Sequence, residues 1–167
     1  PQDDGGFSWG RFAARDNGEL GNDLGNLVQR VAAMATRYQA GVLGDLPPRR
    51  DEMGPYGAAI ESREFNRALD EVWVIVRALN QYIDRVKPWE VAKRRESDVE
   101  AETHLAEILA HAAGTLLQVA DLLLPFLPTT ARSIKNIFAS GVVPADVQPL
   151  FPKIYLHTSD PRAPKQP

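Results

Sequence analysis

Apolar residues recur at three- and four-residue steps through most of this chain, and prolines interrupt the pattern at a few positions. This spacing places apolar side chains on one face of an α-helix, and no segment shows the sustained two-residue alternation of a half-buried strand. The sequence also contains no internal repeat with a fixed period. It therefore predicts an all-α fold, a helical bundle of four to five helices that pack at shallow angles around a core rich in leucine and valine.

The first two expected helices cover residues 20–38 and 65–86. Glycines at 41 and 44 end the first helix, and a polar, proline-containing segment from Pro47 to Pro55 opens a loop. The second helix should stop just before Pro88, because the proline ring disfavours helical geometry in the residue that precedes it. Trp89 is therefore expected at a helix exit.

The third and fourth expected helices lie on either side of a proline-containing break. The apolar period of the third runs from Leu105 to Leu124 and is the broadest in the chain, which predicts the most buried helix. Pro125 ends it. Pro128 suits the first turn of a shorter fourth helix, which Gly141 would close.

Length and composition indicate one domain of ordinary soluble type. The chain has 167 residues, of which 44% are hydrophobic and 25% charged. No uninterrupted apolar run approaches the length needed to span a bilayer, and no basic-then-apolar leader begins the chain, so we expect no membrane partner. Cysteine is absent, which excludes disulfides and thiolate chemistry and favours a cytoplasmic location.

The formal net charge of -3 argues against a broad basic surface that neutralises phosphates. Any contact with nucleic acid should therefore be local. The helix residues Arg30 and Arg37 would contribute to a small positive rim, together with the basic residues of the segment 85–95. The run Lys93 to Arg95 is equally well explained as solvated residues at a helix end.

Three side chains suggest a site for an unpaired nucleobase. Asn26 and Arg30 are four residues apart, so they share a helix face beside the apolar stripe. The amide offers a donor and an acceptor, and the guanidinium offers a planar fork of donors, which together match a base edge. Trp89 would supply an aromatic plate on which a base can stack.

Spacing alone also fits a structural interpretation of the same residues. Asn26 would then be a helix-face amide, and Arg30 would pair with a nearby carboxylate such as Glu19 or Asp23. Trp89 would be a core residue, since tryptophan usually buries its large ring.

The order of several motifs resembles one known family. Segments 7–12 and 17–30 resemble the start of the C-terminal anticodon-binding domain of methionyl-tRNA synthetases, a family of class I aminoacyl-tRNA synthetases. Segments 80–93, 124–128 and 150–154 resemble later landmarks of that domain. The blocks Asn-Asp-Leu-Gly-Asn-Leu-Val and Lys-Pro-Trp-Glu are specific in combination. The resemblance implies a class Ia synthetase type of helical bundle.

The same resemblance implies a division of the chain and a role for it. Residues 1–16 would be a linker from a missing catalytic domain, residues 17–143 the anticodon-binding bundle, and residues 144–167 a tail that packs back on the bundle and then frays. The implied partners are a tRNA anticodon loop and the N-terminal catalytic domain of the same enzyme. That enzyme, methionine-tRNA ligase, attaches methionine to its tRNA using ATP.

Individual site residues follow from the matching positions. The resemblance implies that Asn26 and Arg30 hydrogen-bond the first base of a CAU anticodon, that Trp89 stacks on it, and that Pro88 shapes the pocket. The chain contains no His-Ile-Gly-His or Lys-Met-Ser-Lys-Ser motif. We therefore expect no catalytic site and no cofactor in this chain, with ATP and methionine bound elsewhere in the parent enzyme.

Two alternatives come from other classes of protein. One is a helical interaction or scaffolding module, derived from a synthetase, that has no RNA specificity. The other is a metal site at His104, Glu107 and His111, which share helical spacing. Di-metal bundles place a Glu three residues before a His, and neither histidine here has one, so no metal is expected.

Overall fold

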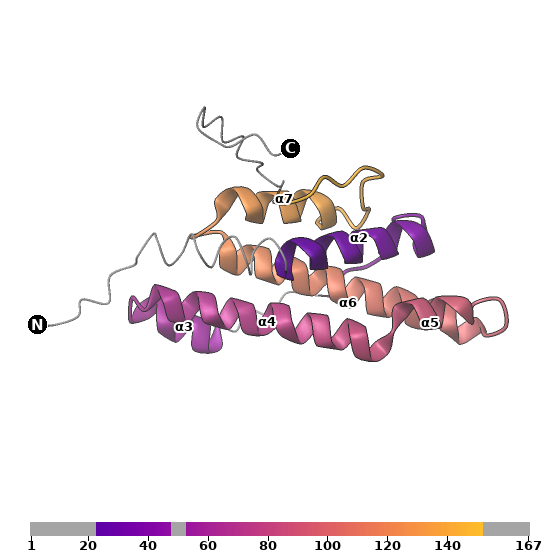
Figure 1. Ribbon diagram of the computed structural model, residues 1–167, viewed down its shortest axis with the longest axis horizontal. Helices are drawn as coiled ribbons and strands as arrows, with labels where there is room; N and C mark the ends of the chain where they lie inside the picture. Colours follow the sequence, from indigo (N-terminus) through magenta and orange to yellow (C-terminus); the bar gives the residue numbers. More distant parts are fainter. Residues whose placement is uncertain (1–22, 48–52, 152–167) are drawn as a thin grey trace, which may run out of the picture.

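The computed structural model describes residues 23–47 and 53–151. These residues form an all-α bundle with no strand, which confirms the predicted fold class (Figure 1). One isolated antiparallel bridge joins Val42 to Val142. The helices are α2 (Gly25–Gln39), α3 (Gly54–Glu61), α4 (Phe65–Val86), α5 (Pro88–Lys93), α6 (Val99–Leu123) and α7 (Pro128–Phe138).

The long helices lie where the apolar period predicts them, apart from two starts. Helix α2 begins at Gly25, whereas the expected helix begins at residue 20, and residues 20–22 lie outside the described residues. The other difference is at α6. This helix begins at Val99, before the first turn that carries the apolar pattern. Its N-cap is Asp98, whose carboxylate accepts a hydrogen bond of 3.0 Å from the Glu100 backbone N–H. The first turn combines two glutamates with an exposed Val99 and a small Ala101, and hydrophobic spacing therefore does not reveal it.

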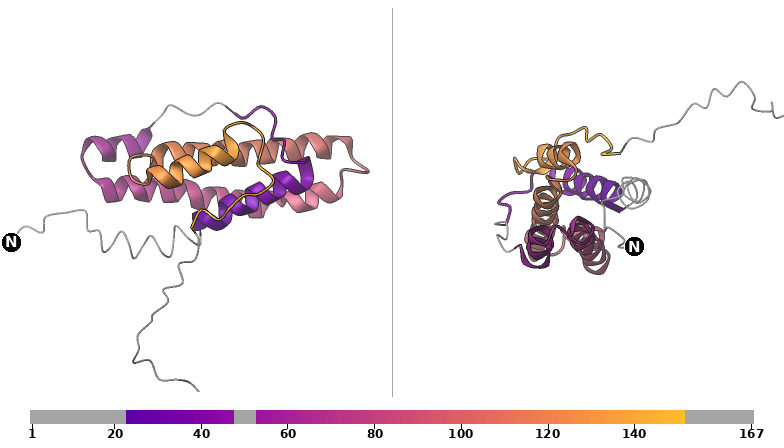
Figure 2. Two further views of the ribbon diagram at one scale, coloured as in Figure 1. Left: turned by 90° about the horizontal axis from the view of Figure 1, so that it is seen from above. Right: turned by 90° about the vertical axis from the view of Figure 1, so that its left-hand side faces the viewer.

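Helix α6 is the centre of the bundle. Helices α2, α4, α5 and α7 all pack against it, and Figure 1 shows it between α7 and α4. By length and composition α6 is apolar enough to cross a membrane, but 61% of its most apolar window is buried inside the bundle. Its composition is therefore explained by its neighbours, which cover it on several sides (Figure 2).

Two short helices, α3 and α5, were not predicted. Helix α3 has only 8 residues and several small ones, so it shows no clear amphipathic period. Its anchor is Tyr56, which is 5% exposed and donates a hydrogen bond of 2.8 Å from its hydroxyl to the Leu122 carbonyl of α6. Helix α5 has 6 residues and follows α4 after a sharp turn.

The segment after α7 returns along the bundle to meet the end of α2. The backbone N–H of Leu43 donates to the Gly141 carbonyl, and that of Val143 donates to the Gly41 carbonyl, each at 2.8 Å. Further on, the Gln29 side-chain amide donates to the Val147 carbonyl at 3.3 Å. Residues 144–151 thus pack on the bundle, whereas the predicted linker at 1–16 and residues 152–167 lie outside the described residues.

The bridge between these segments gives a prediction about two glycines. Gly41 and Gly44 both have a positive φ, of 84° and 67°. A Cβ at Gly41 would lie 2.9 Å from the Val143 carbonyl oxygen, whereas a Cβ at Gly44 meets nothing within 4 Å. Gly44→Ala should cost about 1–2 kcal/mol of backbone strain. Gly41→Ala should cost about 1–3 kcal/mol more because of the close approach.

Urea unfolding followed by far-UV circular dichroism measures both free energies. Equal destabilisation by the two substitutions would show that the bridge tolerates a displaced Val143 carbonyl, which contradicts the prediction.

A second prediction concerns the contact between α3 and α6. Burial raises the pKa of Tyr56, and it also raises the pKa of Tyr82. A raised pKa means that the folded state favours the neutral phenol. The stabilisation is therefore complete below the ordinary tyrosine pKa of about 10 and is lost as the pH rises through the folded-state value.

Tyr56→Phe should cost about 0.5–1.5 kcal/mol at neutral pH, because the Leu122 carbonyl loses its donor. It should also reduce the fall in stability at alkaline pH. Urea unfolding at about pH 7 and about pH 10.5 tests both effects. Tyr82→Phe is the matched control, since it removes an alkaline titration without the hydrogen bond to Leu122. An unchanged free energy of unfolding for Tyr56→Phe at neutral pH would refute the anchoring role.

Candidate base-binding site

The turn between α4 and α5 presents the tryptophan predicted for the site. Lys87 adopts a left-handed conformation with φ 48° and ψ 67°, and its N–H donates to the Ile83 carbonyl at 2.9 Å. Pro88 then occupies the first turn of α5, where a missing N–H has no consequence, and it is buried. Trp89 therefore lies in the first turn of a new short helix, whereas the sequence placed it at the exit of the preceding one.

Arg30 of α2 meets Trp89 of α5. The Arg30 guanidinium carbon lies 5.2 Å from the centroid of the Trp89 ring, within the range of a cation–π contact. The ring is half-buried and packs against the hydrophobic core on one side. The structure thus brings two of the predicted site residues together from two helices that are far apart in the sequence and contact each other.

The carboxylate partner of Arg30 is Asp84 of α4, at 2.7 Å between the Arg30 Nη2 and Asp84 Oδ1 atoms. The carboxylate expected from the sequence was Glu19 or Asp23. Glu19 lies outside the described residues, and Asp84 is 54 positions from Arg30, so no local spacing rule could have found this pair. Asp84 is the site residue that sequence reasoning missed.

Asn26 lies one helical turn before Arg30, and its side chain is exposed. The four predicted residues therefore differ in their surroundings. Arg30 and Trp89 are in contact, Pro88 is buried at the start of α5, and Asn26 borders the contact from the same face of α2. Their role in binding a base remains a prediction.

The basic residues around the site are mostly engaged by neighbouring groups. Lys93 pairs with Glu90 at 3.0 Å, and the guanidiniums of Arg37 and Arg85 lie over the rings of Tyr38 and Tyr82 respectively. These exposed contacts leave the side chains within reach of solvent. A small local positive rim is therefore compatible with the structure.

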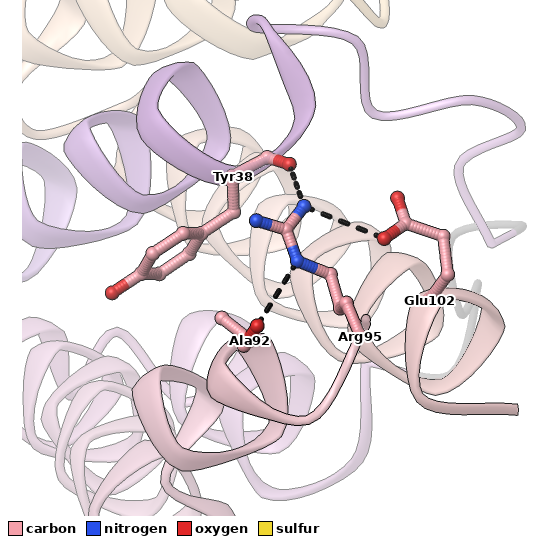
Figure 3. Close-up of polar contacts among 4 residues, drawn as sticks. All are labelled: Tyr38, Ala92, Arg95 and Glu102. Atoms are coloured by element: carbon pink, nitrogen blue, oxygen red, sulfur yellow. Dashed lines mark hydrogen bonds and ion pairs between the residues drawn. The ribbon is translucent and has the colours of Figure 1, made fainter. Parts of the chain in front are cut away.

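Arg95 belongs to neither the rim nor a solvated helix end. Its guanidinium is directed into the junction between α2, α5 and α6, where it bonds backbone carbonyls (Figure 3). Its side chain is only 30% exposed. The interpretation of Lys93 to Arg95 as solvated residues is thus wrong for Arg95, because its side chain is partly buried by contacts with α2 and α6.

The histidines on α6 do not form a metal site within residues 23–47 and 53–151, where no group of three or more potential ligands occurs. His104 lies 3.9 Å from Glu107, and both side chains are exposed. His111 instead makes an edge-on contact with the Tyr82 ring, with 4.9 Å between centroids.

The arrangement suits stacking and hydrogen bonding more than bond-breaking chemistry. The Trp89 indole is half-buried, and the guanidinium that lies over its ring carries five donors in a fixed plane. The Asp84 contact occupies one guanidinium nitrogen. Among residues 23–47 and 53–151, Asp84 is the hydrogen-bond partner of this guanidinium, and a planar fork of this kind can also address the edge of a planar ligand.

Comparison with solved structures defines the class of fold. The chain is similar to the methionyl-tRNA synthetase of Mycobacterium tuberculosis bound by methionyl-adenylate, with a TM-score of 0.65 and 20% identity over 87% of this chain and 34% of that one. A second structure, its apo form, gives a TM-score of 0.64. The chain therefore has the helical-bundle fold that forms part of these two structures. No family model matches the chain.

Sequence relatives identify the family. The chain is 33% identical to the methionine-tRNA ligase of Enterococcus faecalis over 93% of its own length, and 31% identical to methionine-tRNA ligase 1 of Bacillus cereus over 90%. It is 35% identical to the enzyme of Streptococcus pyogenes over 78%. The chain belongs to the methionine-tRNA ligase family. It spans about a quarter of the length of these relatives, 21–27%.

A prediction concerns the ion pair at the site. Both partners are at least one-third exposed, with side-chain exposures of 35% for Arg30 and 64% for Asp84. Such pairs contribute about 0.2–1 kcal/mol. A double-mutant cycle with Arg30→Gln and Asp84→Asn should give a coupling energy in this range at low salt, and the coupling should weaken at about 0.5 M NaCl. Urea unfolding measures it.

The matched control is the pair between Lys93 and Glu90, whose basic partner is more exposed, at 69%, and which lies along a single helix. A coupling above about 2 kcal/mol, or one that salt does not reduce, would mean that the Arg30–Asp84 pair is shielded from solvent.

Proposed function

We propose that this chain binds the CAU anticodon loop of methionine tRNA, as the anticodon-binding domain of a methionine-tRNA ligase. The observation that supports this proposal is the contact of 5.2 Å between the Arg30 guanidinium carbon and the Trp89 ring. It unites an aromatic surface with hydrogen-bond donors at one place on the bundle. Asn26, one turn away on α2, adds an exposed amide.

In this proposal the first base of the anticodon stacks on the indole of Trp89, while Asn26 and Arg30 bond its edge. Pro88 holds the indole at the start of α5. Stacking is worth about 1–3 kcal/mol per base, and a base with the wrong pattern of donors leaves polar groups unpaired. The domain would thus act through differential affinity, without a catalytic group of its own.

The charges of the chain fit this local mode. A net charge of -3 gives little general attraction for phosphates, so binding depends on the few groups that meet the unpaired bases. Single-stranded loops are the part of an RNA whose bases are free to be read in this way. The proposal therefore predicts selectivity for the loop sequence and a modest dependence on salt.

The remaining activities belong to the proposed parent enzyme. A catalytic domain in the same protein would bind ATP and methionine and would attach methionine to the tRNA that this bundle selects. The bundle would then dock on that domain as well as on the tRNA. A cytoplasmic location is part of the same proposal.

The decisive experiment removes the aromatic plate. Trp89→Ala should weaken binding of a hairpin with a CAU loop by about 5- to 150-fold, which corresponds to the loss of one stacked base. Trp89→Phe should lose less, because a smaller ring still stacks. Fluorescence anisotropy of a labelled hairpin at fixed salt measures the dissociation constants, and circular dichroism checks the fold.

Phe65→Ala is the matched control. Phe65 is an aromatic residue that is 43% exposed, and it lies at the other end of α4, about 30 Å from Trp89. Its removal should leave hairpin binding unchanged. A folded Trp89→Ala variant with the affinity of the wild type would overturn the proposal. Equal binding of CAU and altered loops by the wild type would favour the scaffolding alternative.

A further inference from the structure

Arg95 connects the ends of two helices that carry the candidate site. Its Nη1 atom donates to the Tyr38 carbonyl of α2 at 2.5 Å, and its Nε atom donates to the Ala92 carbonyl of α5 at 3.2 Å (Figure 3). Both acceptors lie in the last turn of their helix, where carbonyls have no intrahelical donor. One cation therefore caps two helix C-termini, which is also where a positive charge is favoured.

Two further contacts hold the guanidinium in this position. Its carbon lies 5.8 Å from the centroid of the Tyr38 ring. Its Nη1 atom also approaches the Glu102 carboxylate of α6 at 3.4 Å. The planar fork of arginine can address these acceptors together, whereas the point charge of lysine cannot.

The Arg95 contacts join the same two helices that carry Arg30 and Trp89. Arg30 precedes Tyr38 on α2 by two helical turns, about 12 Å, and Trp89 lies about 6 Å of helix before Lys93, where α5 ends two residues short of Arg95. Helices α2 and α5 contact each other, and both pack against α6. The Arg95 junction therefore lies at one end of the α2–α5 pair and the Arg30–Trp89 contact at the other.

We propose that Arg95 is a positioning residue for the base-binding site: it joins the carboxyl ends of α2 and α5 and thereby sets the spacing between Arg30 and Trp89. A binding group that is about 1 Å out of place loses much of its effect, so this spacing determines how well a base is read. The measurement of RNA binding rests on the proposed function, whereas the measurement of the Trp89 signal in the protein without RNA does not.

The first measurement needs no RNA. The 167-residue chain is labelled with 5-fluorotryptophan, and the ¹⁹F signal of Trp89 is assigned by its loss in Trp89→Phe. In Arg95→Ala this signal should shift or broaden, while that of Trp73, which is 4% exposed in the core, should not. Arg95→Lys should give an intermediate change, and it serves as the second variant if Arg95→Ala does not fold.

The second measurement is the ratio of dissociation constants for a hairpin with a CAU loop and one with an altered first base. Arg95→Ala should reduce this ratio by roughly fivefold or more, the smallest effect expected from one misplaced stacked base. Arg94→Ala is the matched control. It removes the same charge from an exposed neighbour, and it should leave the ratio unchanged.

An unmoved Trp89 signal together with a wild-type ratio in Arg95→Ala would overturn the inference. So would a loss of affinity with an unmoved signal and a salt dependence reduced by about 0.7 in the logarithmic slope, because Arg95 would then contact a phosphate directly. If the wild-type chain shows no base preference, the proposed function fails, and the Trp89 signal alone decides whether Arg95 positions the ring.

Discussion

Burial of the apolar surface of α6 is the interaction on which the rest of the structure depends. Leu105, Ile108, Leu109, Leu116 and Leu123 of this helix are 0–1% exposed, and four other helices cover them. Neither α2 nor α5 would have a defined place without this surface, since α5 is too short to be stable alone and the two touch over a small area. The candidate site is therefore a consequence of how both helices pack on α6.

Local electrostatics organise the site within that frame. Arg30 lies over the Trp89 ring and pairs with the Asp84 carboxylate, and these two contacts fix the position of its guanidinium. Because the Asp84 side chain is 64% exposed, no buried partner neutralises the charge of Arg30. Arg95 has a different role, as a partly buried link between helix ends. In a chain with a net charge of -3, the local positive potential at the site depends on where each basic side chain lies more than on how many there are.

The elements that sequence predicted well are those with long apolar periods or a proline at a boundary. The end of α4 before Pro88 is an example, because the proline restricts the residue before it irrespective of tertiary contacts. The short helix α3 was missed because its stability comes from Tyr56 and the contact with α6, not from a period of its own. Of the candidate site, the face shared by Asn26 and Arg30 followed from helical spacing alone.

The sequence by itself determined the four longer helices, the break at Pro88 and the residues that share a helix face, because backbone geometry repeats every few residues whatever the rest of the chain does. Only the tertiary structure decided that Asp84 pairs with Arg30 and that Arg95 reaches the Tyr38 carbonyl. The partners in these contacts are 54 and 57 positions apart. Such distant residues meet only when helices pack on a common core, and a local sequence pattern does not predict that packing.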